Sequence, residues 1–304
     1  MSDERSVSSD YWALRVSLGP EAADAVTNFL CEAGAAGVVE EGDGAPVVVR
    51  AFFPPGSDPD ATRRRLAEYL NALRELAQPV GPATVDVTRV AEEAWADAWR
   101  AHFRPVPVGR GLLVCPPWEA PSTPANGPGG PRTVVVIEPG RAFGTGGHAT
   151  TQGCLELLER ALEASPVGRV LDVGTGSGVL AIAAARLGVR WVDALDLDPE
   201  AVAAAVANAA RNDVADRVHV VRGAPETWPG VPAELVLANL LGPALVTLAA
   251  PLARCCATPG RLIAGGLLVH EVPGVMAAYI PEGFRLVERI EREGWATLLL
   301  ARDG

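Results

Sequence analysis

The sequence predicts an α/β protein whose larger part is a mostly parallel, doubly wound sheet, preceded by a smaller α+β domain. Three observations carry this prediction. The chain has 304 residues, which suits two domains, and 49% of them are hydrophobic, enough for substantial cores. From about residue 151 strand-like and helix-like segments alternate, as they do in a parallel sheet. The first 90 residues instead show the order strand, helix, strand, strand, helix, strand.

These first 90 residues predict a small domain of the ferredoxin-like type, because their order is that of a split βαβ unit. Apolar spacing and turn signals place the elements, in chain order, at 11–18, 20–33, 36–41, 47–53, 58–77 and 84–90. In the second helix Asp58 is the candidate N-cap and Pro59 holds the first helical position. Residues 1–88 carry 14 acidic and 7 basic residues, which form either a solvated surface or a docking surface for a basic partner.

A helix over Glu92–Phe103 is predicted to link this domain to the rest of the chain. Trp95 and Trp99 lie four residues apart, so they share a helix face and are expected to pack the two domains together. Strands at 111–115 and 133–137 follow, separated by a loop rich in Pro and Gly. The predicted organisation is a ferredoxin-like domain over 1–90, a linker helix over 91–105 and a second domain over 106–304.

The second domain continues as alternating helices and strands. Its helices are predicted at 151–163, 179–187, 199–212, 243–256 and 269–279. Its strands are predicted at 169–173, 191–195, 218–221, 235–238, 261–264, 285–291 and 296–301. The last two strands form a hairpin around Glu291–Gly294, so we expect the parallel sheet to carry an antiparallel edge, with the last strand antiparallel.

Composition narrows the function. The formal net charge is −11, which disfavours direct binding of nucleic acid or an anionic membrane and suits a basic partner. All 26 basic residues are Arg, so the chain has no Lys for a P-loop or a Schiff base. Four dispersed His residues without metal-ligand spacing predict no metal site.

Cysteine usage and hydropathy favour a cytoplasmic location. The five Cys residues are scattered and form no C-x-x-C pair, as expected of reduced thiols in a cytosolic protein. The N-terminal segment is polar and predicts no signal peptide. The uncharged stretch Leu235–Ala253 contains Asn239, Pro243 and Pro251, and therefore reads as a buried strand, a turn and a helix rather than a membrane span.

The strongest chemical signal is a glycine-rich turn after a buried strand. The strand ends in Asp172, and Gly174, Gly176 and Gly178 precede a helix. Glycines permit a tight turn and let a ligand approach the backbone closely. The turn lies at the carboxyl end of a strand, which is where open α/β sheets bind ligands.

The kind of ligand follows from the spacing. The dinucleotide fingerprint would require Gly at position 179, which is Val179, so an NAD-dependent oxidoreductase is disfavoured. The next strand ends in Asp196, whose carboxylate can accept hydrogen bonds from both ribose hydroxyls of a nucleoside cofactor. The two features together resemble the class I S-adenosylmethionine-dependent methyltransferases, with their Rossmann-like sheet. A methyltransferase-like fold that only binds a partner is the remaining alternative from another class.

Two further segments are candidates for the same site. Glycines at 140, 144, 146 and 147 crowd a loop that enters a helix near Thr151, which suits either a ligand-contacting turn or a capped helix after a flexible loop. Asn239 ends an otherwise apolar strand, where its amide carbonyl could accept a hydrogen bond from an incoming amine. Alternatively, Asn239 only caps the strand end.

Taken together, the segments resemble the PrmA family, the methyltransferases of large-subunit ribosomal protein L11. The shared motifs are F-G-T-G-x-H-x-T-T at 143–151, D-V-G-T-G-S-G at 172–178, D-x-D-P at 196–199 and A-N-L-L at 238–241. The resemblance implies S-adenosyl-L-methionine as cofactor, S-adenosyl-L-homocysteine as product, and an N-terminal domain that recognises a basic ribosomal protein. It implies a cofactor site formed by Phe143, Gly144, Thr145, His148, Thr151, Asp172, Gly174, Gly176, Gly178, Asp196 and Asn239.

The implied reaction is methyl transfer to lysine side chains, to the N-terminal α-amine, or to both. A lysine amine has a pKa of about 10.4 and must lose its proton before attack, so we expect placement of the neutral amine to be the main contribution. Asn239 is the candidate catalytic residue, and His148 is expected to be a hydrogen-bonding scaffold rather than a base. A protein-lysine methyltransferase acting on a different protein is the alternative. A nucleic-acid amino-methyltransferase is disfavoured because A-N-L-L lacks an aromatic residue to stack a flipped base. We expect a monomer.

Overall fold

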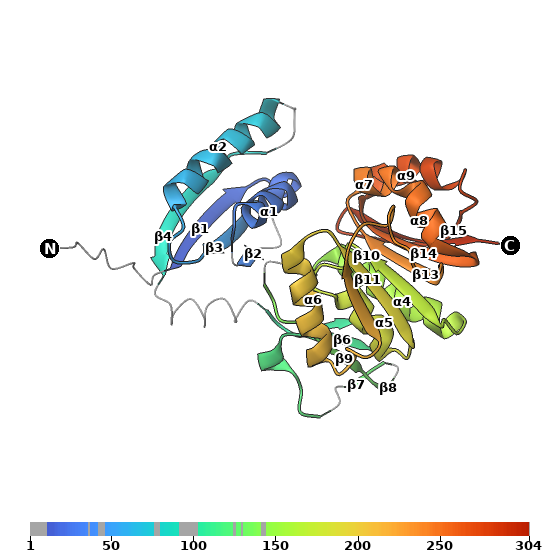
Figure 1. Ribbon diagram of the computed structural model, residues 1–304. Coiled ribbons are helices and arrows are strands. Elements are labelled where there is room, and N and C mark those ends of the chain that lie inside the picture. Colours follow the sequence, from blue (N-terminus) through green and yellow to red (C-terminus); the bar gives the residue numbers. More distant parts are fainter. Residues whose placement is uncertain are drawn as a thin grey trace. The chain divides into compact units, whose positions relative to one another are not determined.

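The computed structural model describes residues 11–35, 37–41, 46–75, 80–90, 103–123, 126–128, 130–140 and 144–303. The chain forms two compact units, residues 1–103 and 104–304 (Figure 1). The predicted linker helix lies outside the described residues except for Phe103, as do Trp95 and Trp99. The limits of the linker and its packing role therefore stay predictions.

The first unit is a four-stranded antiparallel sheet with two helices. In chain order its elements are β1 (Tyr11–Leu18), a short 3-10 turn (Pro20–Ala22), α1 (Ala23–Glu32), β2 (Gly37–Glu41), β3 (Val47–Phe53), α2 (Pro59–Glu75) and β4 (Thr84–Val90). The strand order is β2-β3-β1-β4, and every pair is antiparallel. This is the predicted ferredoxin-like topology.

Alternate residues of the strands are buried and form the core of this unit. Leu14 and Val16 of β1 and Val49 of β3 are fully buried and belong to one apolar cluster with residues of both helices, such as Val26 and Leu66. The predicted cap of α2 is present, because Asp58 Oδ1 accepts a hydrogen bond from the Ala61 amide at 2.9 Å.

The second unit begins with a small three-stranded sheet of β5 (Val106–Val108), β6 (Leu112–Cys115) and β9 (Thr133–Val136), in the order β5-β6-β9. The sequence did not predict β5, which is three residues long and has Pro107 at its centre, so it shows no strand pattern. The segment predicted as a loop contains a 3-10 turn (Pro117–Glu119) and the short pair β7 (Asn126–Gly127) and β8 (Gly130–Pro131).

The main sheet of the second unit has seven strands in the order β12-β11-β10-β13-β14-β16-β15. They are β10 (Arg169–Val173), β11 (Trp191–Asp196), β12 (Val218–Arg222), β13 (Ala233–Asn239), β14 (Cys256–Leu268), β15 (Arg285–Arg292) and β16 (Trp295–Arg302). The pairs among β10 to β14 are parallel, and β16 runs antiparallel to both of its neighbours. The last strand is antiparallel as predicted, but it lies one place in from the edge, because the hairpin folds β15 to the outside.

Helices cover both faces of this sheet. They are α4 (Ala149–Ala164), α5 (Val179–Arg186), α6 (Pro199–Arg211), α7 (Gly242–Thr247), α8 (Ala249–Cys255) and α9 (Val272–Tyr279). Successive strand residues enter different cores: Val170 packs in the cluster that contains α4 and α5, whereas Leu171 packs in the cluster that contains α7, α8 and α9. The three layers are visible in Figure 1.

The helix predicted over 20–33 begins as the 3-10 turn Pro20–Ala22, and three predicted elements of the second unit also differ from the structure. The single helix expected over 243–256 is two helices, α7 and α8, because Pro251 has no amide hydrogen to donate to the carbonyl four residues earlier. The helix expected over 269–279 begins as a 3-10 turn (Val269–Glu271) ahead of α9. Strand β14 is far longer than the expected 261–264, since it pairs with β13 on one side and β16 on the other.

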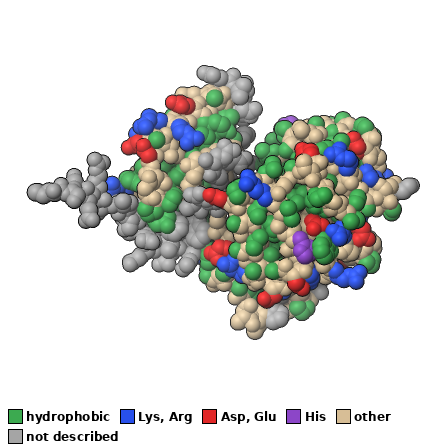
Figure 2. Space-filling model, in the orientation of Figure 1, with side chains coloured by type: hydrophobic (Ala, Val, Ile, Leu, Met, Phe, Trp, Pro, Cys, Tyr) green, Lys and Arg blue, Asp and Glu red, His purple; other side chains and the backbone are tan. Residues whose placement is uncertain are grey.

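The remaining observations concern the cysteines, the hydropathy of the helices and the surface charges. Cys115, Cys154, Cys255 and Cys256 are buried free thiols, whereas the side chain of Cys31 lies outside what the structure describes. Among the described helices none is long and apolar enough to cross a membrane. On the face shown in Figure 2, basic and acidic side chains of the second unit are interspersed.

Candidate active site

The glycine-rich turn after β10 adopts the strained conformation that its sequence predicts. Gly174, Gly176 and Gly178 have φ of +72°, +55° and +85°, a region that other residues rarely adopt. A Cβ atom on Gly174 would lie 2.4 Å from Leu240 Cδ2, so a side chain at this position would require Leu240 to move. The turn then enters α5, whose N-cap is Gly178.

Asp172 lies beneath this turn and is fully buried. The Thr175 hydroxyl donates to Asp172 Oδ2 at 2.6 Å, and Oδ1 has no hydrogen-bond partner among the described residues. Burial raises the pKa of Asp172 to about 7. The hydrogen bond from Thr175 and one from the Ala181 backbone oppose this rise, and the Asp196 carboxylate adds to it. Asp172 therefore holds the turn through a buried hydrogen bond with Thr175, away from solvent.

Asp196, at the end of β11, joins the second strand to the turn. Its Oδ2 accepts a hydrogen bond from the Gly176 amide at 2.9 Å, and its Oδ1 accepts one from the Asp198 amide at 3.0 Å. Each carboxylate oxygen retains acceptor capacity, since it can take two hydrogen bonds. The predicted pair of glycine turn and acidic strand end is thus one connected structure.

The second glycine loop reaches the first through Ser177. The Ser177 hydroxyl donates to the Gly144 carbonyl at 2.6 Å, and Gly144 has a φ of +103°. Thr145, the next predicted residue, is half-buried in this loop. Phe143 lies outside the described residues, so its role stays a prediction.

His148 caps the helix that follows this loop. Its Nδ1 lies 2.8 Å from Thr150 Oγ1 and accepts a hydrogen bond from the Thr150 amide at 3.3 Å. Its ring also meets the ring of Trp295 edge-on, with 5.1 Å between centroids. These contacts hold His148 at the start of α4, and its role as a scaffold residue stays a prediction.

Asn239, at the end of β13, meets the start of α4. Its Nδ2 donates to Thr151 Oγ1 at 3.4 Å, and its Oδ1 is buried without a hydrogen-bond partner among the described residues. The Leu240 amide donates to the Gly265 carbonyl at 3.0 Å, which holds the end of β13 against β14. An amide oxygen without a partner is unusual in a folded interior, and this one is buried beside Gly265 of β14.

Hydrogen bonds therefore join the predicted residues in two groups at the carboxyl ends of the strands. One group links Asp196, the glycine turn and Gly144, and the other links Asn239 and Thr151. Sequence reasoning missed Ser177, which binds the two glycine loops together, and Thr175, which binds the turn to Asp172. Their signal was present, since they are the two hydroxyl residues between the glycines of D-V-G-T-G-S-G.

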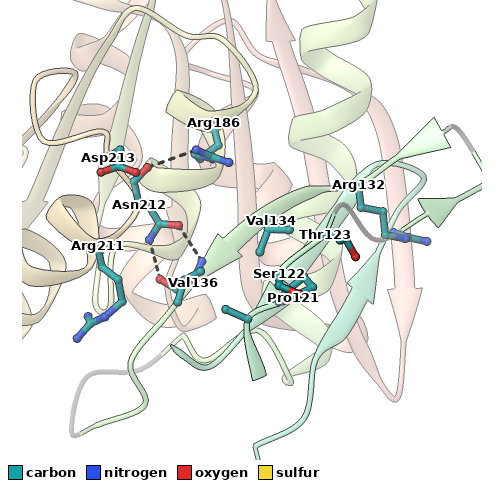
Figure 3. A pocket seen from close by; sticks show the side chains of 11 residues that line it. Pro121, Ser122, Thr123, Arg132, Val134, Val136, Arg186, Arg211, Asn212 and Asp213 are labelled. Carbon is teal, nitrogen blue, oxygen red and sulfur yellow. Dashed lines mark hydrogen bonds between the residues drawn. The ribbon is translucent and has the colours of Figure 1, made fainter. Parts of the chain in front are cut away.

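A pocket of about 390 Å³ lies elsewhere in the second unit and contains none of the predicted site residues (Figure 3). It lies where the end of α6 meets β9. Asn212 bridges these elements, accepting from the Val136 amide at 2.8 Å and donating to the Val136 carbonyl at 2.6 Å. Among the described residues no group of His, Cys, Asp or Glu is arranged to hold a metal ion.

The seven-stranded order with one antiparallel strand, the glycine turn and the acidic end of the next strand define a class I methyltransferase fold. The chain matches the family described as ribosomal protein L11 methyltransferase (PrmA) over residues 10–303, and it belongs to that family.

Individual relatives agree with this assignment. A ribosomal protein L11 methyltransferase from Exiguobacterium sibiricum is 34% identical over 309 residues, covering 93% of this chain and 96% of the relative. One from Geobacter sulfurreducens is 41% identical over 269 residues, covering 88% and 85%. The crystal structure of a ribosomal protein L11 methylase from Lactobacillus delbrueckii subsp. bulgaricus matches with a TM-score of 0.58 and 29% identity, covering 66% of this chain and all of that one.

Proposed function

We propose that this protein transfers methyl groups from S-adenosylmethionine to amines of ribosomal protein L11, on lysine side chains, the N-terminal α-amine, or both. Family membership and the names of the relatives support the substrate. The observation that carries the chemistry is the glycine turn bonded to Asp196, with Asn239 at the end of a neighbouring strand.

The residues present fit the cofactor. The glycines offer backbone without side chains, and Asp196 offers carboxylate acceptors for ribose hydroxyls. When bound, the cofactor supplies a methyl group already activated by its sulfonium. The proposed cofactor site comprises Phe143, Gly144, Thr145, His148, Thr151, Asp172, Gly174, Gly176, Gly178, Asp196 and Asn239.

The protein's task is then to place a neutral amine. Asn239 Nδ2 donates to Thr151 Oγ1 at 3.4 Å, which leaves Oδ1 to accept a hydrogen bond from an amine. A neutral amine can donate an N–H to this oxygen while the lone pair of the amine nitrogen stays free for the transfer. Holding the amine at Asn239 replaces a bimolecular encounter by an oriented one, and this orientation is the main contribution to the rate of methyl transfer. His148 caps α4 through Nδ1 and its ring packs against Trp295, so we assign His148 to loop structure.

The test is intact-mass spectrometry of purified L11 incubated with the enzyme and S-adenosylmethionine. We expect added mass in multiples of one methyl group, lost with Asp196→Ala. Added mass on another protein but not on L11 would favour the same chemistry on a different substrate. An enzyme that binds no S-adenosylmethionine by calorimetry would overturn the proposal.

A further inference from the structure

The β15–β16 hairpin contacts the start of α4 through Arg292. This arginine, at the end of β15, donates to Gln152 Oε1 at 2.9 Å and to Glu156 Oε1 at 2.8 Å. The side chain of Glu156 is only 14% exposed and that of Arg292 33%, so the pair is partly shielded from solvent. Such charge-assisted bonds are stronger than neutral ones.

Gln152 connects Arg292 to the glycine loop. With its oxygen held by Arg292, its Nε2 donates to the Gly147 carbonyl at 2.8 Å. An amide has one acceptor side and one donor side, so Arg292 dictates which side faces Gly147. The result is a relay from Arg292 through Gln152 to Gly147.

The glycine loop is thus held at both of its described ends. We call the glycine-rich turn after β10 the cofactor turn. Its Ser177 hydroxyl donates to the Gly144 carbonyl, and the hairpin holds Gly147 through Gln152. The hairpin also supplies Trp295, whose ring packs edge-on to His148. All of these contacts hold the Gly144–His148 segment, which belongs to the candidate active site.

We propose that Arg292 is a positioning residue, which orients Gln152 so that the Gly144–His148 segment stays in place against the cofactor turn. This inference rests on the proposed function, since it presumes that the segment lines the cofactor site. The competing explanation is that Arg292 merely ties β15 to α4. Arg160 of α4 already makes such a tie, because it contacts Glu288 of β15.

Gln152→Glu separates the two explanations. The glutamate still accepts from Arg292, so the tie between β15 and α4 remains, but it cannot donate to the Gly147 carbonyl. We expect a melting temperature close to that of the wild type and a Kd for S-adenosylhomocysteine raised about five- to tenfold, as for one lost hydrogen bond. Arg292→Met should raise Kd similarly, and the double variant should bind no more weakly than either single variant.

Arg289→Met is the matched control. Arg289 lies on the same strand and pairs with Glu291 of that strand, at 2.5 Å. Its removal should leave Kd unchanged. Calorimetry and thermal unfolding of all variants of the full chain measure both quantities.

The outcomes are distinct. If the wild type binds but Gln152→Glu binds as tightly as Arg289→Met, the relay is overturned and the proposed function stands. If Arg292→Met alone weakens binding, the arginine acts only as a structural tie, which also overturns the inference. If the wild type itself fails to bind, the proposed function falls.

Discussion

The Ser177 hydroxyl donates to the Gly144 carbonyl at 2.6 Å, joining two glycine loops that lie 33 residues apart in the sequence. One loop follows β10 and the other precedes α4. Ser177 is 1% exposed, so neither group has water as an alternative partner. This bond makes the position of one loop depend on the other.

Removing this hydroxyl should therefore loosen the site. Ser177→Ala leaves the Gly144 carbonyl without its partner, and we expect a loss of about 1–3 kcal/mol in the free energy of unfolding, together with weaker cofactor binding. Urea denaturation and calorimetry measure the two effects. Thr247→Ala, which removes an exposed hydroxyl bonded to the Pro243 carbonyl, is the control and should change stability far less. Equal effects from both variants would contradict this interpretation.

Gly174→Ala should destabilise the protein for two separable reasons. A φ of +72° strains any other residue, and the new Cβ would lie 2.4 Å from Leu240 Cδ2. We expect a loss of more than about 1 kcal/mol in unfolding free energy. Gly294→Ala is the matched control, because Gly294 has a φ of +81°, close to that of Gly174, but nothing within 4 Å of its Cβ position. If the two variants are equally destabilised, the contact with Leu240 contributes nothing.

Local signals predicted most elements, and tertiary contacts account for what they missed. The strands β1, β3, β4 and β10 have the predicted limits, because alternation and turn residues are local features. The inward place of β16 depends on competition between strand edges, which no short segment encodes.

The same division holds for the site. Asp196 and the glycines follow from motif and topology. The bonds of Ser177 to Gly144 and of Asn239 to Thr151 span 33 and 88 residues, so their geometry required the folded chain.

Asn239→Ala should separate cofactor binding from turnover. The change removes the amide oxygen that we assign to the amine, and we expect turnover at saturating cofactor to fall about 10²-fold through lost placement. Binding of S-adenosylhomocysteine should fall much less, since Asp196 and the glycine turn remain. Steady-state methylation and calorimetry give the two numbers. Turnover equal to that of the wild type would remove Asn239 from the catalytic assignment.

Asp172 should make stability fall as the pH rises through the weakly acidic range. Burial raises its pKa to about 7 in the folded protein, against about 3.9 when unfolded. Between these values the folded state binds more protons than the unfolded state, so the contribution of Asp172 is greatest below about pH 4 and is lost by about pH 7.

The matched variant is Asp172→Asn, which cannot titrate and can still accept from Thr175. The stability of the wild type relative to this variant should decline by up to about 1.4 kcal/mol per pH unit over that window, and stay level above it. Urea denaturation of both proteins between about pH 4.5 and 8 measures the difference. A difference that is constant with pH would mean that Asp172 is ionised throughout. The turn would then rest on a buried carboxylate charge that the Thr175 hydroxyl and the Ala181 backbone amide help to stabilise.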